Sequence, residues 1–251
     1  MIDKVHPDAG RAAAVVTSGS SVAIGGFGQV GVPVDLIDAL CAADVGDLHV
    51  IANNGGMGLP GERGIGRLLM EGRVRRFSCS FPVNPLFFQQ YFEGRVEIEL
   101  VPQGTLAERL RTGGAGVPAF FTPTAVGTPL GDGGFIQRYR EDGSPQVVQE
   151  RKERRVFDGR SYVLEYALRP DFALVKAHRG DRYGNLRFRL GARNFNPLAA
   201  MAARCTIAEV THLEAADSLP PDDAHLPGAF VDRLVVSDPV AALRPAAELS
   251  S

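Results

Sequence analysis

The apolar residues of this chain follow two alternating patterns, one typical of strands and one typical of helices. Short, mainly apolar runs predict strands at 22–24, 48–52, 76–81, 96–100, 172–176 and 206–210. Apolar residues at helical spacing fall between them and predict helices at 8–16, 34–43, 62–73, 86–93 and 197–203. The alternation predicts an α/β fold: an open, mostly parallel sheet with helices on both faces.

Local signals predict where three of the helices begin. Pro33 is expected at the first helical position, where its missing N–H costs nothing. Thr105 and Glu108 have the spacing of a capping box, and Gly113-Gly114 would end that helix. Asn196-Pro197 predicts an N-cap followed by the first helical residue.

The pattern changes between about 130 and 168. Asp142-Gly143 and Asp158-Gly159 are hairpin turn signals, and short strand-like runs flank them. We therefore expect an antiparallel hairpin excursion from the parallel sheet near 130–168. Residues 1–240, this excursion included, are expected to form a single domain, and 241–251 a poorly ordered tail.

The richest local motif is the segment 21–33, Ser-Val-Ala-Ile-Gly-Gly-Phe-Gly-Gln-Val-Gly-Val-Pro. It predicts a buried strand, a loop of closely spaced glycines and a helix start, an arrangement that favours anion binding. Its glycines also satisfy G-x-G-x-x-G, the pattern of dinucleotide-binding folds. That interpretation requires an acidic residue after the next strand, where this chain has Asn53-Asn54. A third possibility is that the glycines only permit tight packing of the strand against the helix.

Neutral amide side chains follow two of the predicted strands. Asn53 and Asn54 end the strand at 48–52, and Gln103 follows the strand at 96–100. In open α/β sheets, ligands bind beyond the carboxyl ends of the strands. Amides there could stabilise an oxyanion without pairing with a carboxylate nucleophile. The alternative is that Asn53-Asn54-Gly55 only forms a turn.

Composition excludes several classes of protein. The chain has 251 residues and a net charge of −2, which gives no electrostatic case for nucleic acid binding. No apolar run approaches the length of a secretory signal or a membrane span. Cys41, Cys79 and Cys205 are scattered, so we expect a reducing, cytoplasmic location. The five histidines lack metal-ligand spacing, and we expect no metal site.

Several blocks of residues are spread along nearly the whole chain. The first block is Gly25-Gly26-Phe27 with Gly31 and Pro33, followed by Asn53-Asn54-Gly55-Gly56. The others lie at 101–109, 113–124, 171–177 and 192–196. In this order the blocks resemble the family I coenzyme A transferases of the 3-oxoacid (succinyl-CoA) type, and the resemblance points to the A-type (alpha) subunit of these enzymes.

The resemblance implies roles for particular residues. It places Asn53, Asn54 and Gln103 in an oxyanion and acyl site, and Gly25, Gly26, Phe27, Gly28 and Gly31 in a loop that binds CoA or substrate. The family's nucleophile is a glutamate within Ser-Glu-Asn-Gly, a motif that this chain lacks. The resemblance therefore implies a partner, the B-type subunit, that carries the glutamate, and a dimer of heterodimers. It implies CoA as a substrate and no cofactor.

The sequence leaves the acceptor and some roles open. Succinyl-CoA is the donor that the resemblance favours, with acetoacetate or 3-oxoadipate as acceptor. A dicarboxylate acceptor requires a further cation, for which Arg63 and Arg67 are candidates, and the segment 81–88 is a candidate specificity element. Lys176 and His178 follow a predicted strand, where packing or a surface ion pair is the default and substrate contact the alternative.

Three other functions compete with this hypothesis. A transferase for another acyl pair, of the acetate or butyrate type, would share the same motifs. A non-catalytic paralogue could bind CoA or a partner. A sugar-phosphate isomerase on the same general fold would be complete in one chain, but no lysine or carboxylate base stands near the glycine loop.

Overall fold

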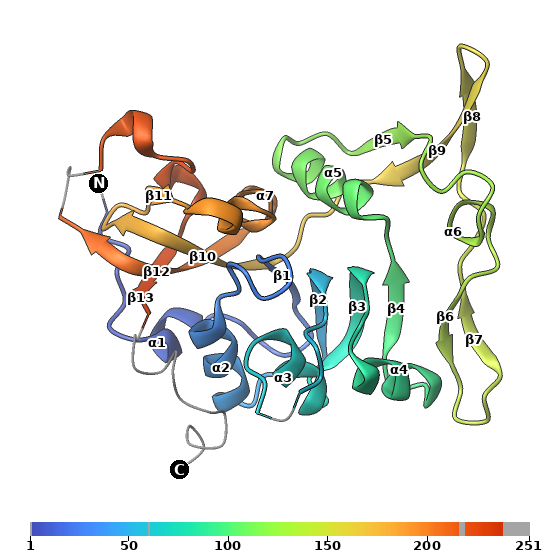
Figure 1. The fold of residues 1–251 in the computed structure, drawn as a ribbon, viewed down its shortest axis with the longest axis horizontal. Coiled ribbons are helices and arrows are strands. Elements are labelled where there is room, and N and C mark those ends of the chain that lie inside the picture. The colour runs from blue at the N-terminus through green and yellow to red at the C-terminus, as the bar shows by residue number, and fades with distance from the viewer. Residues whose placement is uncertain (1, 60, 216–218, 238–251) are drawn as a thin grey trace.

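A computed structural model describes residues 2–59, 61–215 and 219–237. Its centre is an eight-stranded sheet in which seven strands run in parallel in the order β13-β12-β10-β1-β2-β3-β4, and β11 pairs antiparallel with β10 (Figure 1). The strands are β1 Ser21–Ile24, β2 Leu48–Asn54, β3 Val74–Phe81, β4 Glu97–Leu100, β10 Phe172–Asp181, β11 Leu186–Arg187, β12 Cys205–Glu214 and β13 Arg233–Val236. The predicted open, mostly parallel sheet is confirmed.

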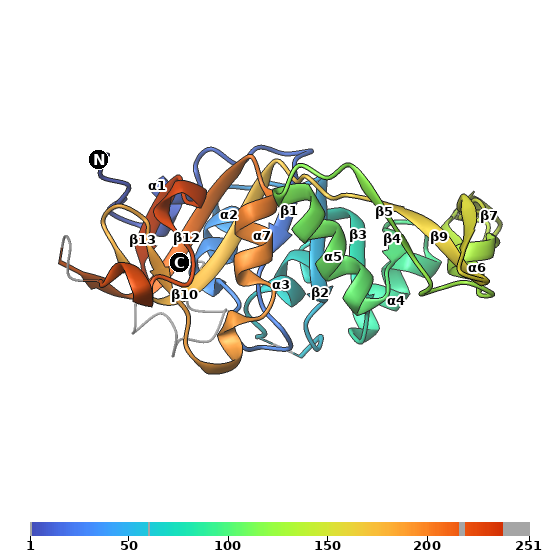
Figure 2. The ribbon, with the colours of Figure 1, turned by 90° about the horizontal axis from the view of Figure 1, so that it is seen from above.

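Helices cover both faces of this sheet, because alternate strand residues point to opposite sides. Val22 and Ile24 pack in one core cluster with the first four helices, whereas Ala23 packs in a second cluster with α5 and α7. The first four helices are α1 Ala9–Ala13, α2 Val34–Ala42, α3 Ile65–Met70 and α4 Pro85–Phe92. On the other face lie α5 Gln103–Gly114 and α7 Asn196–Ala202, which run side by side in Figure 2.

The order of the strands reverses at β1. From β1 to β4 the chain moves outward in one direction, and β10, β12 and β13 extend in the other. Ligands bind beyond the carboxyl ends of strands at such a switch point. The segment from Gly25 to Gly31, which we call the glycine loop, leaves β1 at this point. A ligand site is therefore expected around this loop.

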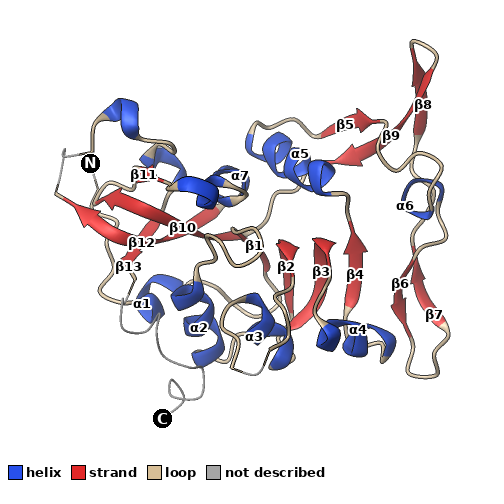
Figure 3. Ribbon diagram, viewed as in Figure 1, coloured by secondary structure: helices blue, strands red, loops and turns tan. Residues whose placement is uncertain are grey.

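Residues 119–166 form an antiparallel excursion, which we call the arm; the sequence predicted it near 130–168, and it begins earlier because β5 pairs with β9. It comprises β5 Ala119–Thr122, α6 Pro129–Asp132, β6 Ile136–Tyr139, β7 Pro145–Val148, β8 Arg154–Phe157 and β9 Arg160–Tyr166. Asp142-Gly143 turns β6 into β7 and Asp158-Gly159 turns β8 into β9. Figure 3 shows that the arm consists almost wholly of strands and loops beyond the β4 edge of the main sheet.

All three predicted helix starts are shifted. Pro33 is the N-cap of α2, not its first residue, and the N–H groups of Asp35 and Leu36 donate to the Glu209 carboxylate of β12, at 3.0 and 3.3 Å. The capping box is wrong, because α5 begins at Gln103, directly after Pro102, and Glu108 pairs with Arg111 instead.

The third shift has a consequence for the candidate site. Asn196 is the first residue of α7 and Phe195 is its N-cap, so the side chain of Asn196 does not cap the helix and can bond elsewhere.

Other elements agree with the sequence except at their ends. The helix predicted at 62–73 is limited to α3, because Gly64 has φ +83° and Glu62 bonds to the preceding loop. The proposed tail 241–251 lies outside the described residues. Within the described ranges no helix combines the length and the hydropathy needed to cross a bilayer.

Candidate active site

A cavity of about 340 Å³ opens at the carboxyl ends of the strands beside the glycine loop. The ends of β2 and β3, the start of α5 and the glycine loop all contribute to its wall. Its lining residues are Phe27, Gly28, Asn53, Asn54, Met57, Ser80, Phe81, Val83 and Gln103. The structure therefore brings the predicted amides together with Phe27 and Gly28 of the predicted loop, whereas Gly25, Gly26 and Gly31 do not line the cavity.

The cavity contains hydrogen-bond donors without partners. Asn53 lines the cavity and is only 5% exposed, and its side-chain amide makes no hydrogen bond to any described residue. The Oγ of Ser80 is buried and likewise has no partner in the described part of the chain. Because buried polar groups are normally hydrogen-bonded, unpaired ones in a cavity point to a ligand that completes them.

The start of α5 adds a second source of positive potential. Gln103 is its first residue, and the first internal bond of this helix is donated by Leu106 to Pro102 O, at 2.9 Å. The N–H groups ahead of Leu106 thus lack helical acceptors, and the positive end of the helix dipole lies at the cavity. This arrangement favours an oxyanion over a cation.

The lining has no ionisable side chain among the described residues. The donors are therefore neutral, and a carboxylate that entered the cavity would keep its charge and its nucleophilicity. No nucleophile for acyl transfer is present in the lining either, apart from the hydroxyl of Ser80, beside which no base lies in the lining. The cavity can polarise a carbonyl but lacks the group to attack it.

The glycine loop is held in a tight turn over this cavity. Phe27 and Val30 exchange both backbone hydrogen bonds at 3.0 Å, and Gly28, with φ +60°, lies between them. The N–H of Gly28 donates to Asn54 Oδ1 at 3.1 Å, which leaves the amide NH₂ of Asn54 free to donate. A left-handed residue at this turn explains the glycine at 28.

Asn196 holds the other end of the loop. Its Nδ2 donates to Gly31 O and to Ala192 O, both at 3.0 Å, and its Oδ1 accepts from the N–H of Lys176 at 2.9 Å. A Cβ at Gly25 would lie 1.8 Å from Asn196 Oδ1. Gly25 is therefore required by the close approach of α7, and Asn196 positions the loop without touching the cavity.

Two further side chains shape the loop between β2 and α3. The Nδ2 of Asn84, which is fully buried, donates to Gly55 O at 3.0 Å, and its Oδ1 caps α4 through the N–H of Leu86. The Glu62 carboxylate accepts N–H groups from Met57, Gly58 and Leu59. Both side chains fix the backbone that carries Met57 into the cavity.

The remaining candidates lie away from the cavity. The Nζ of Lys176 pairs at 2.5 Å with Glu209, which is fully buried, so Lys176 forms an ion pair in the interior and not the expected surface pair. Burial raises the pKa of Glu209. Arg63 and Arg67 pair with Asp35 and Asp38 at 2.8 Å and do not line the cavity, so they cannot serve a ligand there.

A buried polar chain crosses the sheet behind the cavity. His49 Nε2 and Ser78 Oγ are 2.8 Å apart, and Ser78 donates to Glu99 at 2.5 Å. Glu99 also accepts from Arg109 at 2.7 Å. Burial and the charge of Arg76 lower the pKa of His49 to about 4. Burial opposes ionisation of Glu99, but Arg109 and the Ser78 hydroxyl outweigh it and hold its pKa well below the usual range.

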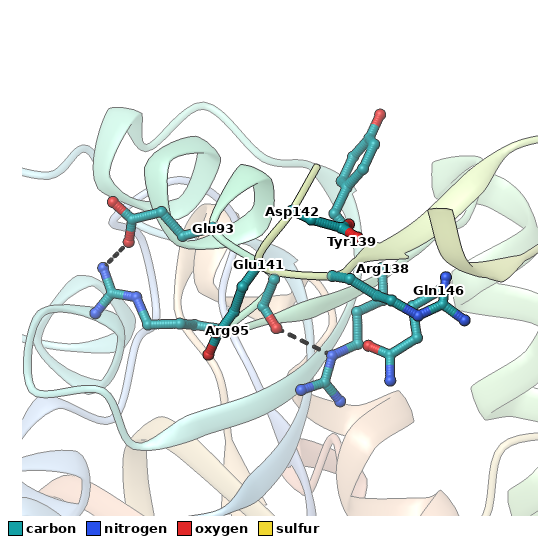
Figure 4. A pocket seen from close by; sticks show the side chains of 9 residues that line it. Glu93, Arg95, Arg138, Tyr139, Glu141, Asp142 and Gln146 are labelled. Carbon is teal, nitrogen blue, oxygen red and sulfur yellow. Dashed lines mark hydrogen bonds and ion pairs between the residues drawn. The ribbon is translucent and has the colours of Figure 1, made fainter. Parts of the chain in front are cut away.

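A larger hollow of about 560 Å³ lies between the end of α4 and the β6–β7 hairpin (Figure 4). Within it Glu93 pairs with Arg95, and Arg138 Nε donates to Gly94 O at 3.0 Å. It is also remote in the fold from the glycine loop. We therefore take the cavity at the strand ends as the candidate site. The described residues hold no cluster of three or more His, Cys, Asp or Glu side chains suited to a metal ion.

Sequence reasoning missed Ser80, Asn84, Glu62 and the true role of Asn196. Ser80 follows Ser78-Cys79 in an apolar strand, and strand alternation could have placed it on the same face as Asn53. The other three act through contacts between segments that are distant in the sequence or through loop backbone, for which no local pattern exists.

Comparison with known proteins identifies the family. Residues 7–237 match the family model described as coenzyme A transferase. The chain is 50% identical to the A-type subunit of the probable succinyl-CoA:3-ketoacid coenzyme A transferase of Mycobacterium tuberculosis, over 93% of this chain and 94% of that one. It is 44% identical to the A-type subunit of the 3-oxoadipate CoA-transferase of Pseudomonas putida, over 96% and 97%.

A solved structure gives the same fold. The acyl-CoA transferase of Escherichia coli O157:H7 superposes with a TM-score of 0.78 at 22% identity, covering 94% of this chain and 47% of that one. With the family model matched over most of its length and relatives at up to half identity, this chain belongs to the coenzyme A transferase family.

Proposed function

We propose that the chain is the A-type subunit of a two-subunit CoA-transferase that moves CoA from an acyl-CoA, with succinyl-CoA the favoured donor, to a 3-oxoacid. The observation that supports this most is the side-chain amide of Asn53, which lines a cavity without ionisable side chains and makes no hydrogen bond to any described residue. Such a cavity suits an oxyanion next to a carboxylate nucleophile that another chain supplies. The names of the A-type relatives point to the same substrates.

The nucleophile in this proposal is the glutamate of a Ser-Glu-Asn-Gly motif on the B-type subunit. Its carboxylate attacks the thioester carbonyl and CoA leaves as a thiolate, which gives an acyl-glutamyl anhydride. The thiolate then attacks the glutamyl carbonyl, which releases the acid and leaves a glutamyl-CoA thioester. The acceptor carboxylate takes CoA by the same steps in reverse.

Each of these steps passes through a tetrahedral oxyanion. Asn53, the free NH₂ of Asn54 and Gln103 would donate to it, and the start of α5 would add its dipole. CoA acts as a substrate, and the mechanism requires no cofactor. A dimer of heterodimers and a cytoplasmic location complete the proposal.

The cavity favours a monocarboxylate acceptor such as acetoacetate. Phe27, Met57, Phe81 and Val83 give it an apolar wall, and no cation from this chain reaches it among the described residues. A dicarboxylate such as 3-oxoadipate would need a cation from the B-type partner. Phe81 and Val83 belong to the segment 81–88, which supports a role for that segment in specificity.

Co-expression tests the proposal. CoA transfer from succinyl-CoA to acetoacetate and to 3-oxoadipate is measured for this chain alone and with a second chain that carries Ser-Glu-Asn-Gly. We expect activity only in the co-expressed sample, with acetoacetate preferred. Activity of the chain alone would refute the proposal that a second subunit supplies the nucleophile. If acetate or butyrate is the best acceptor, the enzyme is a transferase for another acyl pair. If no acceptor receives CoA although the protein binds CoA, the result would favour a non-catalytic paralogue.

A further inference from the structure

A second cavity, of about 360 Å³, lies beside β10 on the side away from the arm, and we call it the cationic pocket. Strand β10, the segment from β11 to η1 (Leu190–Arg193) and the loop before η3 (Gly228–Phe230) build it. Its lining residues are His178, Arg179, Arg187, Phe188, Arg189, Leu190 and His225. Nothing in the catalytic proposal above uses this pocket.

The charge in and around this pocket is predominantly positive. Arg179 pairs with Glu214 at 3.1 Å and Arg187 with Asp223 at 3.0 Å. The side chain of Arg189 has no ion pair or hydrogen bond to any described residue, and Arg193 follows in η1. Four arginines therefore face two carboxylates. Because a guanidinium presents several donors in a fixed plane, each paired arginine keeps N–H groups for a second acceptor.

The aromatic side chains add a neutral donor and a flat surface. His225 Nδ1 accepts the N–H of Phe188 at 3.1 Å, so its Nε2 carries the proton and can donate into the pocket. Burial and the charges of Arg193 and Arg187 lower the pKa of His225, which keeps the ring neutral. Its ring stacks on Phe188, with 6.4 Å between centroids and 12° between planes.

The backbone at the rim of the pocket is strained. Leu190 has φ +50°, in the left-handed region that is unfavourable for a leucine, and its apolar side chain is 85% exposed. Strain of this kind persists where the surroundings impose it, and it concentrates at binding sites. Arg189 lines the pocket on one side of Leu190, and on the other side a Cβ at Gly191 would lie 3.7 Å from the side chain of Val30 in the glycine loop.

The cationic pocket is connected to the candidate active site through η1. Asn194 Nδ2, directly after η1, donates to Val30 O at 3.0 Å, and Asn196 joins Ala192 O to Gly31 O. The glycine loop thus has the catalytic cavity on one side and η1, with the cationic pocket, on the other. A long substrate whose reactive end lies in the first could place its other end in the second.

We propose that the cationic pocket binds the phosphate groups at the nucleotide end of the CoA substrate. The ligand chemistry is that of phosphate esters: Arg189, Arg187 and Arg179 would donate charge-assisted hydrogen bonds, and His225 Nε2 a neutral one. This inference rests on the proposed function for the identity of the ligand. Free phosphate or another nucleotide could supply the same groups, and the experiment separates these sources.

Calorimetric titration of the full chain with adenosine 3′,5′-bisphosphate, CoA, 3′-dephospho-CoA and inorganic phosphate tests the site. The test variant is Arg189→Gln, and the matched control is Arg155→Gln, which removes an exposed arginine from the arm. We expect Arg189→Gln to weaken binding of the bisphosphate and of CoA by about tenfold or more, as loss of a charged hydrogen bond does. Arg155→Gln should bind like the unaltered chain.

The outcomes discriminate between the sources. A smaller loss for 3′-dephospho-CoA than for CoA places the 3′-phosphate in the pocket. If Arg189→Gln weakens binding of inorganic phosphate but not of CoA, the assignment of the pocket to CoA is wrong. If the unaltered chain and both variants bind every ligand with equal affinity, the cationic pocket is not a phosphate site. These titrations require no turnover, so they test CoA binding separately from transfer. If the chain binds CoA through Arg189 but the co-expressed enzyme transfers no CoA, the proposed function is refuted and the phosphate-binding proposal is not.

Discussion

The carboxyl edge of the main sheet and the arm use polar residues in opposite ways. At the sheet edge, Asn53, Asn84 and Asn196 are buried, and two of them join segments that lie far apart in the sequence. The arm buries Glu165 in a pair with Lys152, but its Arg155–Glu153 pair is exposed and links residues two positions apart. The buried asparagines fix the backbone in one geometry, whereas an exposed pair such as Arg155–Glu153 contributes little beyond local order.

The apolar side chains of the main sheet and of the arm differ in how deeply they are buried. Alternate residues of β1 and β2 are buried in the two core clusters, but Val156, Phe157 and Tyr166 of the arm are 64%, 45% and 66% exposed. Substitutions at the sheet edge should therefore cost stability and activity together, and equivalent substitutions in the arm should cost little. The following predictions test that contrast.

The largest difference is expected between two glycines. Gly25→Ala puts a Cβ 1.8 Å from Asn196 Oδ1, whereas the Cβ of Gly143→Ala in the arm meets nothing within 4 Å. We expect Gly25→Ala to lower the free energy of unfolding by about 3–5 kcal/mol and to abolish transfer, through overpacking and lost hydrogen bonds. Gly143→Ala, at φ +80°, should cost about 1 kcal/mol and keep activity. Urea unfolding and transfer assays measure both, and similar losses would contradict the contrast.

Two glutamates give the next comparison. Glu209→Ala removes the buried partner of Lys176 and the acceptor for Asp35 and Leu36 N–H, so about 3–5 kcal/mol should be lost. Glu153→Ala breaks only an exposed pair in the arm and should change stability by less than about 1 kcal/mol. Thermal and urea unfolding of both variants provide the measurement. A Glu209→Ala protein as stable as Glu153→Ala would mean that the buried pair is not needed.

Acid should destabilise the sheet through His49. Its pKa is about 4 in the folded chain against an ordinary 6.5, so the unfolded chain binds the proton first and stability falls as the pH drops from about 6.5 to 4. The lowered pKa of Glu99 continues the loss below about pH 4.5. Urea midpoints between pH 7 and 4 should fall less steeply in His49→Gln. Equal slopes in the two proteins would show that His49 is not buried in its neutral form.

The smallest effect is expected at β8. Val156→Thr changes an exposed side chain and keeps the β-branch, so the free energy of unfolding should change by less than about 0.5 kcal/mol. Thermal unfolding at several protein concentrations checks this. A larger loss that depends on concentration would show that this strand is covered in an assembly.

The sequence predicted the layered sheet because buried strands and amphipathic helices leave periodic patterns. It also predicted the association of Asn53, Asn54, Gln103 and Gly28, because the carboxyl ends of parallel strands meet at one edge. Both hairpin turns followed from their Asp-Gly pairs.

The failures have a common physical cause. Glu209 of β12 replaces a local cap at α2, and Asn196 bonds to the glycine loop instead of capping α7. Thr105 has the capping spacing, but α5 begins two residues earlier and leaves its Oγ1 without a partner among the described residues. Each case is a tertiary contact or a helix start that overrides a local signal, and no window of sequence contains that information.

The most direct test of the account is the turnover of Gln103→Ala in the assembled two-subunit enzyme. Gln103 lines the cavity and is exposed at the start of α5, so its loss should leave the complex intact. Loss of one oxyanion donor lowers kcat by about 100- to 1000-fold. We predict a fall of that size with unchanged assembly by size-exclusion chromatography. Unchanged kcat in an intact complex would contradict the assignment of this cavity as the acyl site.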